Sequence, residues 1–254
     1  MKALVLAAGR GRRLWPYTAQ RPKCLLLLNG DTILQRQLAQ LERAGVGEAV
    51  VVCGHGLVHV QEALSAYTGL LRLRTTPNPL YDEADNLLSL WAARTELQGD
   101  VLLLNGDGVF HPGILEKLAA TRAECCLAVA RKAEYDEEDM KVELRDGRLV
   151  RIGKNVPPSS ADAESVGALR LSGSGGPHLH RATEELVAVG DASRRYFVDA
   201  VQRLADAGFP VTCCDTDGLP WADIDTPADL AAVRRNLHRF QGAGAPLGRA
   251  KGSG

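Results

Sequence analysis

Short apolar runs alternate along the chain with segments in which apolar residues recur every three or four positions. Residues 2–7 are almost wholly apolar, which is typical of a strand buried on both faces of a sheet. Residues 31–44 repeat apolar side chains at helical spacing, begin at a capping residue (Asp31 or Thr32) and end before Gly45, so they predict a helix. By the same reasoning, strands are predicted over 48–53, 70–75, 100–105 and 124–130, and helices over 57–66, 85–97 and 112–122.

This alternation of strands and helices with short connections is the pattern of a parallel sheet covered by helices on both faces. The predicted fold class is therefore α/β, with a doubly wound, mostly parallel, Rossmann-like sheet. Ligands of such sheets bind beyond the carboxyl ends of the strands. Residues 8–23 and 105–111 follow two predicted strands, so they are the first places to look for a binding site.

The pattern changes after about residue 132. Residues 141–145 and 148–153 flank Asp146-Gly147, which predicts a hairpin with a tight turn. Further strands are predicted over 164–171 and 210–214, and helices near 177–189, 193–207 and 227–241. We expect a single domain over residues 1–241, with a first half (1–131), a small α+β portion or lid (132–222), a closing segment (223–241) and a disordered tail (242–254).

Composition narrows the class of protein. The chain has 254 residues, of which 45% are hydrophobic, and a net charge of −1, so neither a nucleic-acid nor a membrane partner is indicated. Its six cysteines form no CxxC motif and lie mostly in apolar segments, which favours reduced, buried thiols. The chain starts directly with a predicted strand rather than a signal peptide, so we expect a cytoplasmic protein.

The loop after the first strand carries the most informative chemistry. Gly9 and Gly11 let the backbone approach a ligand closely, and their free N–H groups can form an anion-binding nest. The loop also holds basic residues suited to phosphate oxygens: Arg10, Arg12, Arg13, Arg21 and Lys23. It lacks the third glycine of a dinucleotide-binding fingerprint and the GK[ST] of a P-loop. A solvated basic loop is the alternative.

Residues 6–23, LAAGRGRRLWPYTAQRPK, resemble the signature L-A-A-G-x-G-x-R-L-x-P-x-T-x-x-x-P-K of the sugar-phosphate nucleotidyltransferase superfamily, and they match every fixed position. The resemblance implies that Arg13 contacts the β- and γ-phosphates of a nucleoside triphosphate and Lys23 its α-phosphate. It also implies a nucleotide-binding wall made of Leu6, Ala7, Ala8, Gly9 and Gly11.

Two acids match the positions at which members of this superfamily hold Mg²⁺. Asp107 follows the strand over 100–105, and Asp225 precedes the last predicted helix. The resemblance implies that both bind the metal and that Arg13, Lys23, Asp107 and Asp225 are the catalytic residues. Asn105 departs from the D-x-D of many relatives, although the second acid is kept. Read alone, Asp107 is a turn residue and Asp225 a helix-capping acid.

Residues 78–90 resemble the N-x-x-Y-x-x-x-N-N-x-x-S-L stretch of bacterial choline-phosphate cytidylyltransferases, which implies CTP as the nucleotide. Asn78, Asn86 and Ser89 are the expected nucleotide contacts, and Asp107 completes that set. Asp85 stands where the pattern has its first paired Asn. A helix cap and first turn explain Asp85 and Asn86 almost as well.

Residues 136–142 resemble the D-x-E-D-M-K-V segment of cytidylyltransferases that act on small phosphonates or phosphates. Lys141, Lys154 and Glu164 match that branch, and with Trp221 they are the expected acceptor-binding residues. A solvated edge lysine is the alternative for Lys141. The low aromatic content, 5%, disfavours an aromatic cage for choline phosphate and favours a small anionic phosphonate or phosphate.

The predicted activity is therefore a Mg²⁺-dependent transfer of CMP from CTP to a small phosphonate or phosphate monoester, with release of pyrophosphate. Under this reading residues 1–131 bind the nucleotide, 132–222 bind the acceptor and 223–241 supply the last metal ligand. A sugar-1-phosphate or inositol-phosphate nucleotidyltransferase using UTP, dTTP, GTP or CTP remains an alternative, as does a non-catalytic nucleotide-binding subunit. A homodimer is left open.

Overall fold

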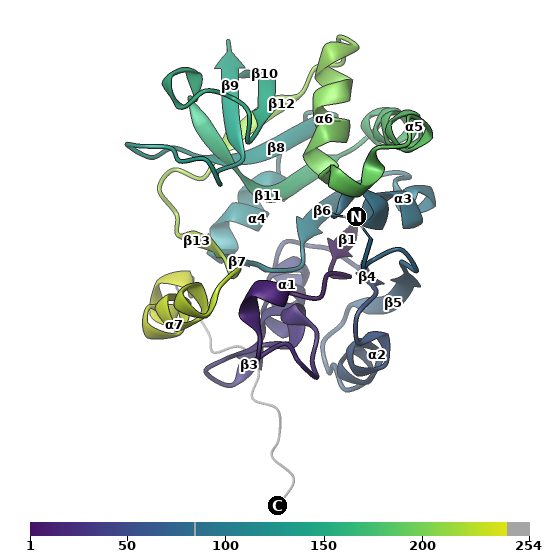
Figure 1. The fold of residues 1–254 in the computed structure, drawn as a ribbon, viewed down its shortest axis with the longest axis vertical. Coiled ribbons are helices and arrows are strands. Elements are labelled where there is room, and N and C mark those ends of the chain that lie inside the picture. The colour runs from purple at the N-terminus through teal and green to yellow at the C-terminus, as the bar shows by residue number, and fades with distance from the viewer. Residues whose placement is uncertain (84, 243–254) are drawn as a thin grey trace, which may run out of the picture.

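The computed structural model describes residues 1–83 and 85–242 of the chain, so residues 243–254 of the predicted tail lie outside it. Its centre is a nine-stranded sheet in the order β5-β4-β1-β6-β11-β8-β12-β10-β9 (Figure 1). The strands are β1 (Lys2–Leu6), β4 (Glu48–Cys53), β5 (Arg72–Pro77), β6 (Val101–Asn105), β8 (Cys125–Ala130), β9 (Lys141–Arg145), β10 (Arg148–Gly153), β11 (Ala163–Leu171) and β12 (Thr212–Asp215).

The predicted doubly wound α/β fold is confirmed, with a sheet more mixed than expected. β5, β4, β1 and β6 are parallel, as are β8 and β12. β11 runs antiparallel between β6 and β8, and the hairpin of β9 and β10 extends the far edge. The sheet is mixed because residues 141–171 return to it as a hairpin and a long strand, without the helical crossover that a parallel connection needs.

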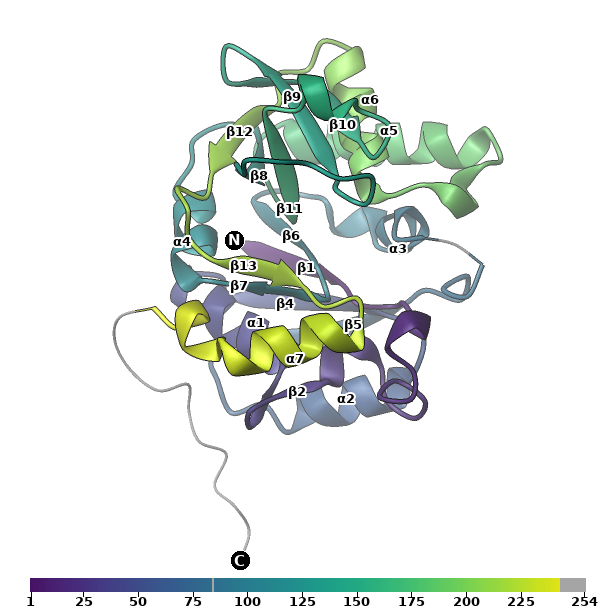
Figure 2. The same cartoon turned by 60° about the vertical axis from the view of Figure 1, so that its left-hand side comes forward.

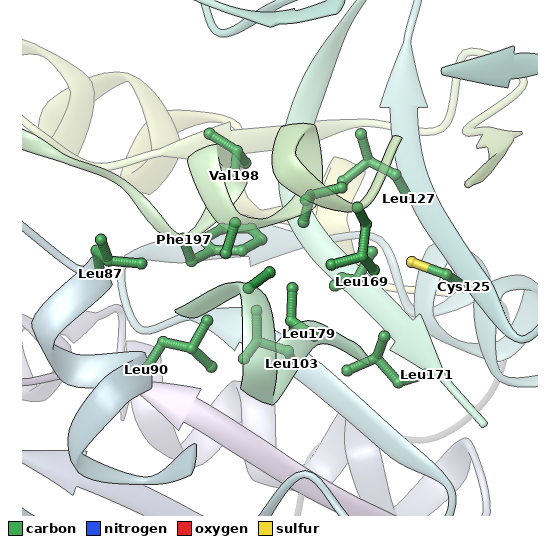
Figure 3. Packing of buried hydrophobic residues seen from close by; sticks show 14 of the residues in the cluster. Leu87, Leu90, Leu103, Cys125, Leu127, Leu169, Leu171, Leu179, Phe197 and Val198 are labelled. Atoms are coloured by element: carbon green, nitrogen blue, oxygen red, sulfur yellow. The ribbon is translucent and has the colours of Figure 1, made fainter. Parts of the chain in front are cut away.

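Helices cover both faces of the sheet. The helices are α1 (Ile33–Arg43), α2 (Leu57–Ser65), α3 (Leu87–Ala92), α4 (Pro112–Ala119), α5 (Gly175–Ala188), α6 (Phe197–Asp206) and α7 (Pro227–Arg235). Alternate strand residues face opposite cores: Leu4 packs in the cluster that includes α3, α5 and α6, whereas Val5 packs in the cluster that includes α1, α2 and α4. Figure 3 shows the first cluster, in which Leu90, Leu179 and Phe197 converge over the sheet.

Several predicted elements are shorter in the structure. The helix predicted over 85–97 is α3 followed by a 3₁₀ turn at Arg94–Glu96, and the helix predicted over 193–207 begins only at Phe197. The hairpin turn is as predicted, because Asp146 (φ 52°) and Gly147 (φ 73°) both take left-handed backbone conformations. All six cysteines are free, and four of them are buried.

Two small strand pairs were not predicted. β2 (Leu27–Leu28) pairs with β3 (Asp31–Thr32), and β7 (Gly108–Phe110) pairs with β13 (Trp221–Asp223). Figure 2 shows β7 and β13 side by side. This second pairing brings the late segment 221–225 beside residue 107, and the Ile224 amide donates to the Asp107 carbonyl at 3.3 Å.

The start of α7 is held by reciprocal hydrogen bonds. The Asp229 amide donates to Thr226 Oγ1 at 3.2 Å, and the Thr226 amide donates to Asp229 Oδ2 at 2.7 Å. Asp229 Oδ2 also accepts from the amide of Asp225 at 3.1 Å. The cap therefore fixes the backbone on which Asp225 is carried.

Replacing the capping hydroxyl should weaken the start of α7. We expect Thr226→Ala to lower the free energy of unfolding by about 1 kcal/mol, because one helix N–H loses its acceptor. Thr226→Ser keeps the hydroxyl and is the matched control. Urea denaturation followed by circular dichroism measures the free energy of unfolding of both variants. An equal loss of stability in Thr226→Ala and Thr226→Ser would contradict the capping role.

Candidate active site

A cavity of about 670 Å³ opens beyond the carboxyl ends of β1 and β6. Its walls come from the glycine loop after β1, the turn after β6, β13 and the region of residues 136–167. Among the predicted site residues, the cavity is lined by Leu6, Ala7, Ala8, Gly9, Gly11, Arg13, Lys23, Asn86, Ser89, Asp107, Lys154, Glu164, Trp221 and Asp225. Asn78 and Lys141 are not in the wall.

The glycine loop folds back on itself, so that Lys23 lies against its start. Gly11 has a φ of 61°, and a Cβ built there would lie 3.2 Å from the Cβ of Lys23. Thr18 Oγ1 donates to the Gly11 carbonyl at 2.8 Å, and Leu14 is fully buried beneath the loop. Glycine is required at position 11 by both backbone conformation and close packing.

Lys23 lies between two carboxylates from distant parts of the chain. Its Nζ is 2.7 Å from Asp107 Oδ2 and 2.6 Å from Asp225 Oδ1, and Arg13 Nη2 is 3.1 Å from Asp225 Oδ2. Burial acts to lower the pKa of Lys23, but Asp107 and Asp225 outweigh it, so the pKa is raised. Burial acts to raise the pKa of Asp225, but the positive charges of Lys23 and Arg13 outweigh burial, so the pKa of Asp225 is lowered. Both shifts favour the charged forms of Lys23 and Asp225.

Asp223 is a site acid that the sequence reasoning missed. Burial, followed by the neighbouring charge of Asp107, raises its pKa well above the usual range. Asp223 Oδ1 and Asp107 Oδ1 are both buried without a hydrogen-bond partner in the described structure. The available signal was the spacing of Asp223 and Asp225, two residues apart at the end of a strand.

The carboxylates fit a divalent metal ion, because buried oxygen atoms without protein partners are ligands that hard cations prefer. Asp107 and Asp223 supply such atoms, and Asp225 adds a third carboxylate beside them. In the described residues, no three acids converge on one point as they stand. The ammonium of Lys23 lies between Asp107 and Asp225 instead.

Two predicted nucleotide contacts serve other roles. Asn78 is buried, and its Nδ2 donates to Ser89 Oγ at 3.1 Å while its Oδ1 accepts from the Leu80 amide at 2.9 Å. The prediction of a direct contact was therefore wrong for Asn78, which supports Ser89 from behind. Asn86 lines the cavity, but both polar atoms of its side chain already have partners. Asn86 Nδ2 donates to Asn105 Oδ1 at 3.0 Å, and the backbone amide of Phe197 donates to Asn86 Oδ1 at 2.7 Å.

Lys141 is also corrected by the structure. It is 1% exposed, and its ammonium donates to the carbonyl oxygens of Asp136 at 2.6 Å and Asp139 at 3.3 Å. Because β9 pairs with both β10 and β11, its first residue lies inside the sheet rather than at an edge. Lys141 therefore shapes the turn over 136–139 and is neither a cavity-lining residue nor a solvated edge lysine.

Glu164 has an unusual environment within the cavity wall. Lys132 Nζ lies 2.7 Å from Asp139 Oδ1 and 3.0 Å from Glu164 Oε2, so one ammonium is shared by two acids. Burial raises the pKa of Glu164 to about 7, with Lys132 opposing the shift and Asp139 adding to it. Burial therefore favours the protonated form of Glu164 more than it does for an exposed glutamate.

Comparisons with known proteins identify a family and several similar proteins. The family described as MobA-like NTP transferase domain matches residues 3–140. CMP-5'-(3-aminopropyl)phosphonate synthase of Streptomyces rubellomurinus is 31% identical over 241 residues, which cover 90% of this chain and 37% of that protein. The 2-aminoethylphosphonate cytidylyltransferase of Lancefieldella rimae is 26% identical, over 91% of this chain and 90% of that protein.

Two further similar proteins have different names. The bifunctional IPC transferase and DIPP synthase of Rubrobacter xylanophilus is 32% identical, over 90% of this chain and 50% of that protein. This chain therefore spans half or less of the first two curated relatives. The inositol-1-phosphate CTP transferase from T. maritima superposes with a TM-score of 0.79 at 22% identity, covering 94% of this chain and 95% of that one. That likeness shows the fold.

Substitution of the two loop glycines should have unequal effects. We expect Gly11→Ala to lower the free energy of unfolding by about 1–2 kcal/mol, because alanine at a positive φ is strained and its Cβ would press on Lys23. Gly9→Ala is the matched control, because a Cβ there meets nothing within 4 Å. Thermal unfolding of both variants measures the difference, and equal stabilities would contradict the strained turn.

The raised pKa of Glu164 predicts a pH-dependent contribution to stability. Between its ordinary pKa of 4.5 and its folded value of about 7, the folded chain binds more protons here than the unfolded chain. The free energy of unfolding therefore falls as pH rises through this window.

We expect the free energy of unfolding of wild type to fall between pH 5 and 8 by about 1–3 kcal/mol more than that of Glu164→Gln, because glutamine does not titrate. Denaturation at several pH values measures it, with the surface acid variant Glu143→Gln as the control. Parallel stability curves for wild type and Glu164→Gln would refute the shift.

Proposed function

Because the chain belongs to the MobA-like NTP transferase domain family, we propose that it transfers CMP from CTP to a small phosphonate or phosphate monoester and releases pyrophosphate. The observation that carries the proposal is the meeting of Lys23, Arg13, Asp107 and Asp225 in one cavity at the strand ends. Relatives named for CMP transfer to phosphonates support the choice of nucleotide and acceptor. The six free cysteines fit a cytoplasmic setting.

In the proposed reaction an oxygen of the acceptor's phosphonate or phosphate forms a bond to the α-phosphorus of CTP. The bond from that phosphorus to the oxygen bridging to the β-phosphate breaks, and its electron pair leaves with pyrophosphate. The attacking oxygen is already ionised, so the site needs no strong general base. Catalysis is then positioning combined with electrostatic stabilisation.

Residues of the chain supply both the positioning and the electrostatic stabilisation. Lys23 is placed to stabilise charge that develops on the α-phosphate, and Arg13 extends the positive surface toward the leaving group. The backbone around Gly9 and Gly11 lets the triphosphate lie close to the loop. Asp107, Asp223 and Asp225 would hold Mg²⁺, which when bound neutralises triphosphate charge and orients the phosphates.

Inositol phosphate is the second candidate acceptor. The name of the T. maritima inositol-1-phosphate CTP transferase, which shares the fold of this chain, supports this candidate. The catalytic residues would act in the same way on either acceptor, so the choice depends on the residues around Glu164 and Lys154.

Removing the charge of Lys23 should abolish most turnover. We expect Lys23→Met to lower kcat for pyrophosphate release from CTP and 2-aminoethylphosphonate by about 10²-fold or more, because the developing charge loses its closest protein cation. Lys117→Met, which removes a surface lysine paired with Asp217, should leave kcat unchanged. A coupled pyrophosphate assay measures both.

The same assay, run with CTP, UTP, dTTP, GTP and ATP, tests the nucleotide. A clear preference for CTP supports the proposal, whereas turnover confined to another nucleotide or to sugar 1-phosphates would overturn it.

A further inference from the structure

The side-chain amide of Asn105 lies in the cavity wall and has no role in the reaction described so far. Asn105 is the last residue of β6, two positions before Asp107. It is also the residue at which the sequence departs from the D-x-D pattern, so an amide stands where that pattern has a carboxylate. An amide has both donor and acceptor atoms, and its orientation decides which of them it offers to a ligand.

A chain of hydrogen bonds fixes the orientation of this amide. The backbone N–H of Phe197, at the start of α6, can only donate, and it donates to Asn86 Oδ1 at 2.7 Å. Asn86 therefore turns its Nδ2 toward Asn105 and donates to Asn105 Oδ1 at 3.0 Å. The Nδ2 of Asn105 is left on the other side of its amide group. One backbone N–H thus sets the direction of two side-chain amides.

The Nδ2 of Asn105 faces the cavity as a free donor. Within residues 1–83 and 85–242, the side chain of Asn105 has one hydrogen bond, the one that its Oδ1 accepts from Asn86. The buried side-chain atoms without a partner in this part of the chain include Asp107 Oδ1 but not Asn105 Nδ2, so solvent reaches this nitrogen. Because Asn105 lines the cavity, the amide offers N–H groups to a ligand bound there.

Two neighbouring elements hold Asn105 in this position. Gln37 Nε2 of α1 donates to the backbone carbonyl oxygen of Asn105 at 2.8 Å. On the other side, the pairing of β11 with β8 shifts register between Ser165 and Leu169, around Gly167. Gly167 has a φ of 74°, and a Cβ built there would lie 2.6 Å from Asn105 Nδ2. Glycine at this position therefore leaves room for the nitrogen beside β11.

The contact with Gly167 puts the donor beside the part of the chain that we expect to bind the acceptor substrate. β11 also contributes Glu164 and Ser165 to the cavity wall. In the proposed reaction the attacking oxygen comes from that side and must reach the centre at Asp107. Asn105 lies between the two, because Gly167 lies against its amide and Asp107 follows it by two residues.

We propose that Asn105 Nδ2 donates a hydrogen bond to an oxygen of the phosphonate or phosphate group of the acceptor substrate, and that Asn86 is the positioning residue that keeps this donor facing the cavity. The inference rests on the proposed CMP transfer and adds a residue that binds the attacking group. A hydrogen bond to an anionic oxygen is stronger than one between neutral groups. A carboxylate at position 105 would repel the same oxygen.

Asn105→Asp replaces the atom that faces the cavity and keeps the shape of the side chain. The aspartate still has an oxygen to accept from Asn86 Nδ2, whereas the donor becomes a charged hydrogen-bond acceptor. With the other substrate and Mg²⁺ saturating, we expect KM for 2-aminoethylphosphonate to rise about tenfold or more and KM for CTP to stay within about twofold of wild type. Asn236→Asp is the matched control and should change neither KM, because Asn236 is exposed and donates to the Ala232 carbonyl oxygen.

Asn86→Asp tests the orientation of the amide without changing Asn105. Aspartate at position 86 still accepts from the Phe197 N–H but cannot donate, so Asn105 must turn its Nδ2 toward it and face the cavity with Oδ1. We expect KM for 2-aminoethylphosphonate to rise by about threefold to thirtyfold, again without a matching rise for CTP. In an Asn105→Ala background no amide is left to turn, so the same change at position 86 should add nothing further.

The remaining outcomes separate the inference from the proposed function. An unchanged KM for 2-aminoethylphosphonate in Asn105→Asp, or a rise that CTP shares equally, overturns the inference and leaves CMP transfer standing. An effect of Asn86→Asp that persists in Asn105→Ala overturns the positioning role of Asn86. If the wild-type chain turns over choline phosphate or inositol 1-phosphate instead, the same KM comparison is made with that substrate. If it releases no pyrophosphate from CTP with any of the three, the proposed function fails and the inference fails with it.

Discussion

A buried ammonium between two carboxylates is the interaction around which the site is organised. Lys23 reaches Asp107 and Asp225, which are 84 and 202 positions away in the chain. None of the three could be desolvated at low cost alone, and removing one charge would leave the others uncompensated. The contact therefore requires the loop after β1, the turn after β6 and the segment after β13 to meet at one point.

The rest of the fold explains how they meet. Parallel pairing of β1 with β6 places both strand ends at the same edge of the sheet. The short β7–β13 pair then brings the late acids to that edge, and the cap of α7 fixes the backbone of Asp225. Gly11 allows the loop to turn back so that Lys23 faces these acids. The same edge carries the glycine loop, which is the proposed binding place of the nucleotide.

The order of the elements and part of the candidate site could be predicted from the sequence. The order of strands and helices follows from apolar periodicity. Lys23 follows from the long motif over residues 6–23, Asp107 from its place after a predicted strand, and Asp225 from its place before the last predicted helix, in each case with the resemblance to a known family. Asp223 was missed because three-residue strands such as β13 leave no periodic pattern to show which acids share a strand. Asn78 and Lys141 were misassigned because a motif fixes a residue's position but not the direction of its side chain, which here depends on Ser89 and on two backbone carbonyl groups.

The most direct test of the account is ³¹P NMR of the protein incubated with CTP, Mg²⁺ and 2-aminoethylphosphonate. Nucleotidyl transfer at the Lys23 centre predicts a new pair of mutually coupled signals, one from the phosphonate and one from the former α-phosphate, together with an equal amount of pyrophosphate. CTP that stays intact, or that yields free CMP while the phosphonate signal is unchanged, would contradict transfer to the acceptor.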